Sequence, residues 1–323
     1  MLKCSHDTEW LCISIHCTYP SAQNERNRYR IMKKFNKIIA MVLAVLFVAA
    51  SFAACSSNNE GKEKTEKTQK VKVVDIALSD EEYAFGVDKK QPELKDKVNT
   101  FIKDLKSNGK LDEICNHYFA NGEPQGVTSA AEDSSKDQLV VATNAEFEPF
   151  EYKKGNTFYG IDMEIAKALA DSLGKELVIK DMKFDAVVTS VQQQKCDIAM
   201  AGLTVNPSRA AQVDFSESYY SASQKLVVKG DDTTFDACKT KEDVEKILNG
   251  LDANVKIGGQ NGTTAQSYVQ GSEDMGFAGL KAQFVGYDNA SLAMQDLVNG
   301  NLNYVMVDAA PAVAITTAIN NVA

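Results

Sequence analysis

Four polar stretches carry the side chains best suited to chemistry, and each follows the end of a predicted strand. They are "ATNAEFEPFEY" (142–152), "MAGLTVNPSR" (200–209), "GGQNGTTAQ" (258–266) and "VMVDAA" (305–310). Arg209 offers the planar pair of donors that suits a carboxylate. Asp308 offers a negative charge for an ammonium group. These two residues together predict a site for a small molecule that carries both charges.

Other groups in and near these stretches would complete such a site. Thr204 and Thr264 offer hydroxyl and backbone N–H groups near helix starts, which favour an anion. Phe147 and Phe184 offer apolar faces. An arginine, an aspartate and aromatic walls are what an α-amino acid needs, so this is the ligand we expect.

Each of these residues has a plainer interpretation when taken alone. An arginine near a helix start is usually a solvated surface charge, and a phenylalanine is usually a core residue. Asp308 could simply cap the helix that follows it. Only the combination carries the prediction.

The elements that would position these residues form an α/β protein. From Gln138 onward, strands alternate with amphipathic helices in two blocks, 138–229 and 240–321. This pattern predicts two lobes, each with a largely parallel sheet covered by helices on its faces. Ligands bind beyond the carboxyl ends of such strands. The site is therefore expected in the cleft between the lobes.

Bulk composition narrows the class of partner. The chain has 323 residues, a formal net charge of -9 and 7 cysteines. An acidic chain is a poor binder of nucleic acid, which needs a clustered basic surface. Cys115, Cys196 and Cys238 show neither a CxxC pair nor zinc spacing, so we expect buried or half-buried thiols, no metal and no cofactor.

An export segment precedes the globular part. Residues 32–54 combine a lysine-rich start, an apolar core and a small-residue exit, which is typical of a secretory signal. Cys55 follows directly, and the junction resembles the lipobox of bacterial lipoproteins, with lipid expected on this thiol. Plain cleavage or an uncleaved anchor are the alternatives. Residues 55–71 are polar and charged, which predicts a flexible tether. Residues 1–31 lie upstream of the signal and are interpreted as an extension of doubtful translation, so Met32 is the expected start.

Residues 138–323 resemble the polar-amino-acid substrate-binding proteins of bacterial ABC importers, which are solute-binding family 3 with the type II periplasmic-binding-protein fold. The resemblance rests on the stretches above together with "GIDMEIAKAL" and "FDAVVTSVQQQKCDIAM". It implies a two-lobed Venus-flytrap that closes on a free L-amino acid and delivers it to permease subunits. We therefore expect a monomeric, lipid-anchored protein on the extracytoplasmic face of the cell membrane.

The resemblance also implies roles for individual residues. Arg209 would hold the α-carboxylate with help from the Gly202 N–H, the Thr204 hydroxyl and the Thr264 N–H, and Asp308 would hold the α-ammonium. The side-chain stem would lie between Phe147 and Phe184. Asn144 stands where several binders of cationic amino acids have aspartate, which argues against a basic substrate, although Glu146 is close enough in sequence to substitute.

Residues 81–119 read like the end of a protein of this family but lie near the start of this chain. "EEYAFGV" resembles the strand that returns to the first lobe, expected beside "QKLVVKG" (224–230), and "PELKDKVNTFIKDLK" and "LDEICNHYF" resemble the closing helices. The chain is therefore expected to be circularly permuted. Lobe 1 would comprise 83–120 and 137–229, lobe 2 would comprise 72–82 and 230–323, and 121–136 would be the linker. A fused scrap or a domain swap are the alternatives.

An enzyme is the main competing function, since periplasmic dehydratases of small acids use the same fold. Such an enzyme needs a general acid or base in the cleft. Glu146 is the one candidate that the sequence offers, so a binding protein is expected instead. A sensor for a membrane receptor is a third function that the sequence does not separate from transport.

Overall fold

The structure, a computed structural model, describes residues 69–322, which lie within one compact unit. The predicted signal, Cys55 and nearly all of the tether fall outside the described residues. Within 69–322, no helix is long and apolar enough to cross a membrane.

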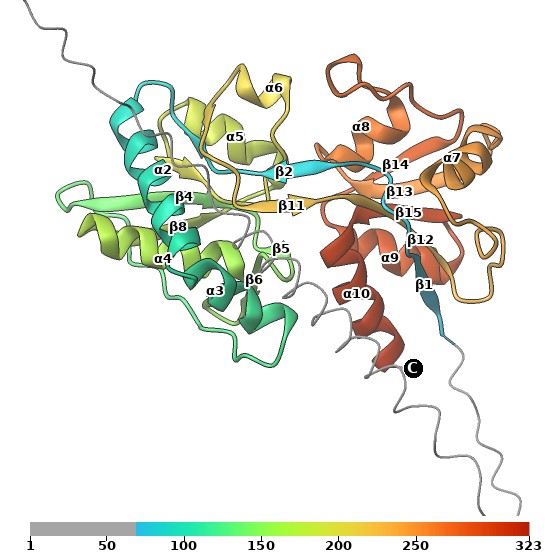
Figure 1. Cartoon of the computed structure of the whole chain (residues 1–323), viewed down its shortest axis with the longest axis horizontal. Helices are drawn as coiled ribbons and strands as arrows, with labels where there is room; N and C mark the ends of the chain where they lie inside the picture. The colour runs from blue at the N-terminus through green and yellow to red at the C-terminus, as the bar shows by residue number, and fades with distance from the viewer. Residues whose placement is uncertain (1–68, 323) are drawn as a thin grey trace, which may run out of the picture. The chain divides into compact units, whose positions relative to one another are not determined.

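One five-stranded sheet forms the framework of what we call lobe 2 (Figure 1). Its order is β1 (Val71–Val74), β12 (Gln224–Lys229), β15 (Tyr304–Asp308), β13 (Lys256–Gln260) and β14 (Gln283–Tyr287). The β13–β15 and β13–β14 pairs are parallel, as predicted, whereas β1 and β12 run antiparallel to their neighbours. The helices of this lobe are α7 (Lys241–Asn249), α8 (Thr264–Gln270), η2 (Glu273–Met275), α9 (Ala290–Asn299) and α10 (Ala309–Asn321).

Side chains alternate between the two faces of this sheet. Val227, Val305 and Val307 belong to a core cluster with Met294 and Leu297 of α9. Their strand neighbours, such as Leu226, Val228 and Met306, belong to a separate cluster with residues of α7 and α8. The sheet is thus covered on both faces, which explains why its strands read as nearly continuous apolar runs.

A second five-stranded sheet forms lobe 1. Its order is β10 (Asp214–Phe215), β3 (Gly86–Val87), β9 (Ile198–Ala199), β4 (Gln138–Thr143) and β8 (Glu176–Asp181). Its helices are α2 (Pro92–Ser107), α3 (Lys110–Phe119), α4 (Ile161–Leu173), α5 (Phe184–Gln192) and α6 (Pro207–Ala210). A small three-stranded antiparallel sheet that the sequence analysis missed follows β4, with strands β5 (Glu146–Phe147), β6 (Glu151–Lys154) and β7 (Thr157–Tyr159). Its strands are too short to show a period of two residues.

Two antiparallel strands run between the lobes, β2 (Glu81–Tyr83) and β11 (Tyr220–Ala222), and Figure 1 shows them side by side. The early segment contributes to both lobes, because β1 pairs with β12 and β3 lies between β10 and β9. The prediction that "EEYAFGV" pairs with 224–230 was wrong. Its first half pairs instead with the three residues of β11, and β1 takes the place beside 224–229 because Val71 and Val74 bury apolar side chains there.

The predicted linker lies along lobe 1. Val127 exchanges two backbone hydrogen bonds with Phe158, at 2.7 and 2.9 Å, and its side chain is buried. Ala130 N–H donates to the carbonyl of Leu177 at 2.8 Å. One buried apolar residue among turn-forming residues therefore attaches this stretch to the lobe.

Candidate ligand-binding site

Residues from both lobes enclose one small cavity. Seven of the eight predicted site residues line it, and the two further lining residues are Gln260 and Thr263; the full lining is Phe147, Phe184, Gly202, Thr204, Arg209, Gln260, Thr263, Thr264 and Asp308. The eighth predicted residue, Asn144, lies directly behind Gln260 and accepts a hydrogen bond from it at 2.8 Å. The prediction thus brought together residues that lie up to 164 positions apart, from 144 to 308.

Arg209 is placed by a capped helix start. Asn206 is the N-cap of α6 and accepts a hydrogen bond from the Arg209 backbone N–H at 2.8 Å, with Pro207 at the first position of the helix. The buried guanidinium donates to the Thr204 carbonyl at 2.7 Å and to the Gly262 carbonyl of lobe 2 at 2.9 Å. It lies over the Phe184 ring, 5.2 Å from its centre. Burial lowers the pKa of Arg209 to about 10, so it is cationic at neutral pH.

Asp308 ends β15 and is also buried. Its Oδ1 accepts a hydrogen bond from the Tyr83 hydroxyl at 2.6 Å. Burial first, and then the nearby Glu81 carboxylate, raise the pKa of Asp308 to about 7, while hydrogen bonds from Tyr83 and Gln224 act in the opposite direction. An ammonium group beside this carboxylate would favour its charged form.

Glu81 and Tyr83 support the site, and the sequence analysis missed both. Glu81 accepts hydrogen bonds from the hydroxyls of Ser79 and Thr204, each at 2.6 Å, and from Gln224 Nε2 at 3.0 Å. The Thr204 hydroxyl therefore donates to Glu81, so it faces a ligand only as an acceptor. Glu81 and Tyr83 alternate with the exposed Glu82 along β2, so they share one face of the strand. This alternation was the signal in the sequence, because it places Glu81 on the same face as a large aromatic side chain.

The backbone N–H of Gly202 already has a hydrogen-bond partner within lobe 1. Its N–H donates to Asp162 Oδ2 at 2.9 Å, and Asp162 also accepts from the Tyr219 hydroxyl at 2.5 Å. The expected donation from this N–H to a ligand would require Asp162 to release it. Gly202 has φ +52, and a Cβ there would lie 3.0 Å from the Phe147 ring. The glycine thus lets this ring approach the cavity.

Thr264 offers a free polar group. Its hydroxyl is buried and has no hydrogen-bond partner among the described residues. A buried hydroxyl without a partner is costly, and it is rare in native proteins. The Thr264 side chain is therefore a ready contact for a polar ligand.

The cavity carries one charged group of each sign. Of the described residues that line it, Asp308 is the one carboxylate and Arg209 the one cation. Glu146, the predicted candidate for acid–base catalysis, does not line the cavity. It is exposed, and its Oε2 accepts from Asn289 Nδ2 at 3.0 Å. Across residues 69–322, no cluster of three or more His, Cys, Asp or Glu side chains could hold a metal ion, and Cys115, Cys196 and Cys238 are free thiols.

The titration of Asp308 predicts how ligand affinity depends on pH. If the ammonium of a ligand pairs with ionised Asp308, binding below pH 7 must first displace a proton. We expect affinity to be nearly constant around pH 8 and to fall by up to about tenfold per pH unit below 7. Tyr83→Phe removes a hydrogen bond that favours the charged form, so it should move this midpoint to higher pH. Calorimetric titration between pH 5 and 9 measures both, and an affinity that is flat across this range in both proteins would contradict the assignment.

Two α/β lobes joined by paired strands, with charged groups from both facing one cavity, define a ligand-binding protein of the type II periplasmic-binding-protein class. The chain belongs to the bacterial extracellular solute-binding proteins, family 3, whose sequence pattern matches residues 139–305. The predicted family and fold class are confirmed.

Several curated proteins are similar to this chain. The arginine-binding extracellular protein ArtP of Bacillus subtilis (strain 168) is 40% identical over 106 residues, which are 33% of this chain and 42% of ArtP. The ABC transporter arginine-binding protein 1 of Escherichia coli (strain K12) is 30% identical over 178 residues, 55% of this chain and 65% of that protein. Cyclohexadienyl dehydratase of Pseudomonas aeruginosa is 27% identical over 176 residues, 54% of this chain and 60% of the enzyme. The chain thus spans less than two thirds of the length of each.

Among solved structures, an ancestral arginine-binding protein bound to glutamine is 35% identical, with a TM-score of 0.47 over 58% of this chain and 76% of that one. The ancestral amino acid-binding protein AncCDT-1 is 30% identical, with a TM-score of 0.47 over 65% of this chain and 78% of that one.

Proposed function

We propose that this protein captures a free polar L-amino acid outside the cytoplasm and delivers it to an ABC importer. The observation that carries the proposal is the meeting of Arg209 and Asp308 at one cavity, each buried and each from a different lobe. Such a pair matches the carboxylate and the ammonium of an amino acid. The names of its relatives support this function, since they include arginine-binding and ABC transporter proteins.

Binding requires the lobes to move apart and close again. The cavity measures about 10 Å³, which is about the space of one water molecule and far below that of a ligand pocket. Arg209 to Gly262, Gln260 to Asn144, and Asn289 to Glu146 are hydrogen bonds between the lobes, and the ion pair of Lys183 with Asp288 adds to them. These contacts are polar and few, so opening about the β2–β11 pair is feasible.

Lipid on Cys55 would hold the protein at the membrane. The support is the sequence of residues 32–55, an apolar segment that ends in two small residues and a cysteine. Cells fed a labelled fatty acid should transfer the label to the parent protein and not to a Cys55→Ser protein. Label on both proteins or on neither would contradict lipid attachment at Cys55.

The chain order is best explained by circular permutation, with the lobe boundaries and linker given above. Asn320 in α10 accepts hydrogen bonds from the backbone N–H groups of Lys70 and Val71 and donates to the Val71 carbonyl. A chain that passed directly from 322 to 70 would therefore need little rearrangement. The new ends of the folded part lie side by side, as permuted ends should.

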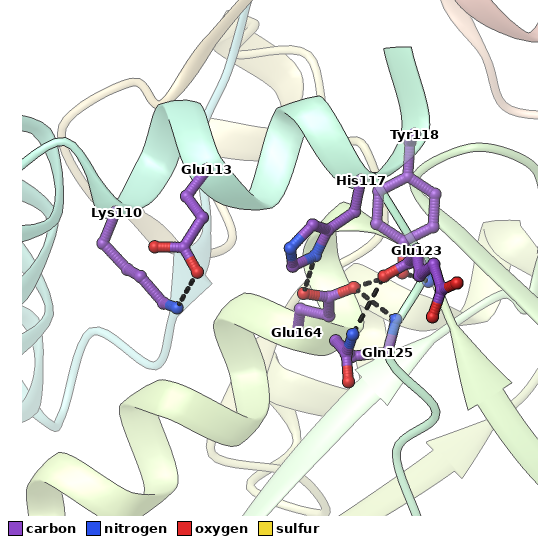
Figure 2. A network of polar contacts seen from close by, with 8 residues as sticks. Lys110, Glu113, His117, Tyr118, Glu123, Gln125 and Glu164 are labelled. Carbon is purple, nitrogen blue, oxygen red and sulfur yellow. Dashed lines mark hydrogen bonds and ion pairs between the residues drawn. The ribbon is translucent and has the colours of Figure 1, made fainter. Parts of the chain in front are cut away.

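A buried carboxylate attaches the closing helix α3 and the start of the linker to α4 of lobe 1, as Figure 2 shows. Glu164 in α4 accepts hydrogen bonds from His117 Nδ1 at 2.7 Å, from the Tyr118 hydroxyl at 2.6 Å and from the backbone N–H of Gln125 at 2.8 Å. The first two donors belong to the closing helix α3 and the third to the linker. This network supports the view that α3 was once the end of lobe 1 and that the linker continues from it.

Enzyme activity is the second candidate because one relative is a dehydratase. The cavity argues against it, since Asp308 would have to serve both as the ammonium partner and as the general acid or base. Thermal-shift screening of the full chain against the common L-amino acids tests the leading proposal. A true ligand at about a hundred times its Kd should add roughly 2.7 kcal/mol to the free energy of unfolding. Failure of every amino acid to stabilise the protein would remove the proposal.

A further inference from the structure

We propose that the part of this cavity lined by Gln260, with Asn144 behind it, selects an amino acid whose side chain is uncharged and ends in a carboxamide. This inference rests on the proposed function and adds the substrate class to it. It starts from two buried amides, Asn144 of lobe 1 and Gln260 of lobe 2, which are 4% and 5% exposed.

The two amides bind each other across the lobes. Gln260 Nε2 donates to Asn144 Oδ1 at 2.8 Å and to the backbone carbonyl of Asp288 at 2.9 Å. Asn144 Nδ2 donates to the backbone carbonyl of Met182 at 2.9 Å. No hydrogen bond in the described part of the chain reaches Gln260 Oε1. When the lobes open, the Asn144–Gln260 bond must break, and each amide then needs a new partner.

A carboxamide is the side-chain group that replaces this bond most completely. Its N–H₂ donates to Asn144 Oδ1 or Gln260 Oε1, and its oxygen accepts from Gln260 Nε2. Both protein amides thus keep a neutral partner inside the closed cavity. A guanidinium or an ammonium group offers donors alone, so it gives Gln260 Nε2 no acceptor in place of Asn144 Oδ1, and only the Asp288 carbonyl remains.

The charges of the cavity point the same way. Arg209 and Asp308 are the charged residues among those described around it, one of each sign, and the ligand backbone neutralises both. A third charge on the ligand side chain would be buried without a partner. Burying an unpaired charge costs far more than burying a hydrogen-bonded amide.

Two neighbouring carboxylates, Glu81 and Glu146, do not change this count. Both oxygens of Glu81 already accept from protein side chains, and it lies behind Thr204, beside Asp308. Glu146 is exposed and bonded to Asn289 outside the cavity. Glu81 therefore has no free oxygen for a cation, and the Glu146 carboxylate is exposed to solvent rather than placed at the cavity lining.

Calorimetric titration of the detergent-purified full chain tests the selection directly. The probes are L-glutamine, L-asparagine, L-arginine, L-lysine and L-glutamate. We expect the better carboxamide to bind at least about tenfold more tightly than every charged probe. A smaller preference, or tighter binding of a charged probe or of another amino acid, overturns the inference and leaves the proposed function standing. Absence of binding by any amino acid would overturn the proposed function itself.

Matched substitutions test whether Asn144 and Gln260 determine this preference among side chains. Asn144→Asp adds a carboxylate directly behind Gln260 and should reduce the carboxamide-to-arginine affinity ratio at least about tenfold, whereas the exposed Asn156→Asp should change it less than about twofold. Gln260→Glu, with the exposed Gln283→Glu as its control, serves if Asn144→Asp does not fold. An unchanged ratio in a folded cavity variant would contradict the inference.

Discussion

Replacing Arg209 with alanine should nearly abolish amino-acid binding and leave the fold intact. The guanidinium is buried, lies over Phe184 and reaches across to the Gly262 carbonyl of the other lobe. Its removal leaves the ligand carboxylate desolvated without a partner and also removes a contact that holds the lobes together. Truncating one member of a buried charge pair costs about 2–5 kcal/mol or more, which is roughly a 30- to 5,000-fold loss of affinity.

Two controls separate this effect from loss of structure. Ser208→Ala changes the exposed neighbour of Arg209 on the same short helix and should bind like the parent. Arg209→Lys keeps the charge but loses the planar pair of donors, so its affinity for the ligand should lie between those of Arg209→Ala and the parent protein. The comparison is a calorimetric titration with the ligand found by thermal shift. An Arg209→Ala protein that bound within about threefold of the parent would show that Arg209 does not hold the carboxylate.

Deleting residues 1–133 should leave a protein that is insoluble or lacks fixed tertiary structure. The deletion removes β3 from the middle of the lobe 1 sheet, so β9 and β10 lose the strand that joins them. It also removes the fully buried side chains of Leu78, Tyr83, Phe85, Val98 and Ile102. Each such side chain contributes about 1.5–3 kcal/mol, and together they rival the whole stability of a domain, about 5–15 kcal/mol.

Moving the segment should rescue the deleted protein. A re-ordered chain, 134–323 followed by 71–120, keeps every strand pair and joins two ends that Asn320 already holds together. We expect it to fold cooperatively and to bind the same ligand with similar affinity. Circular dichroism, thermal unfolding and titration of the two proteins measure this. Normal folding and binding by the deleted protein would mean that the early segment is a dispensable scrap.

The site could be predicted where local sequence sets the geometry. Asn206 and Pro207 mark a helix start, which fixes Arg209 one turn later, and Asp308 follows a continuous apolar strand. Ligands bind beyond the carboxyl ends of such strands, so two lobes that face each other are expected to place these residues at one cleft.

The supporting contacts of the site and the pairing of β2 could not be predicted, because they depend on residues that are far apart in sequence. Tyr83 meets Asp308 across 225 positions, and Glu81 meets Thr204 across 123 positions, and no local pattern encodes such pairs. The commitment of the Gly202 N–H to Asp162 is likewise a tertiary contact. The strand partner of Glu81–Tyr83 was misassigned because the segments 220–222 and 224–229 are adjacent in sequence, although only the first passes between the lobes.

The most direct test of the central claim is one calorimetric comparison of three ligands on the full chain: the amino acid that binds, its N-acetyl derivative and its C-terminal amide. The acetyl group removes the ammonium that Asp308 would hold, and the amide removes the carboxylate that Arg209 would hold. If these two residues clamp the ligand backbone, both derivatives should bind at least about 30-fold more weakly than the parent amino acid, a loss of about 2 kcal/mol or more. Binding of either derivative within about threefold of the parent would contradict the account.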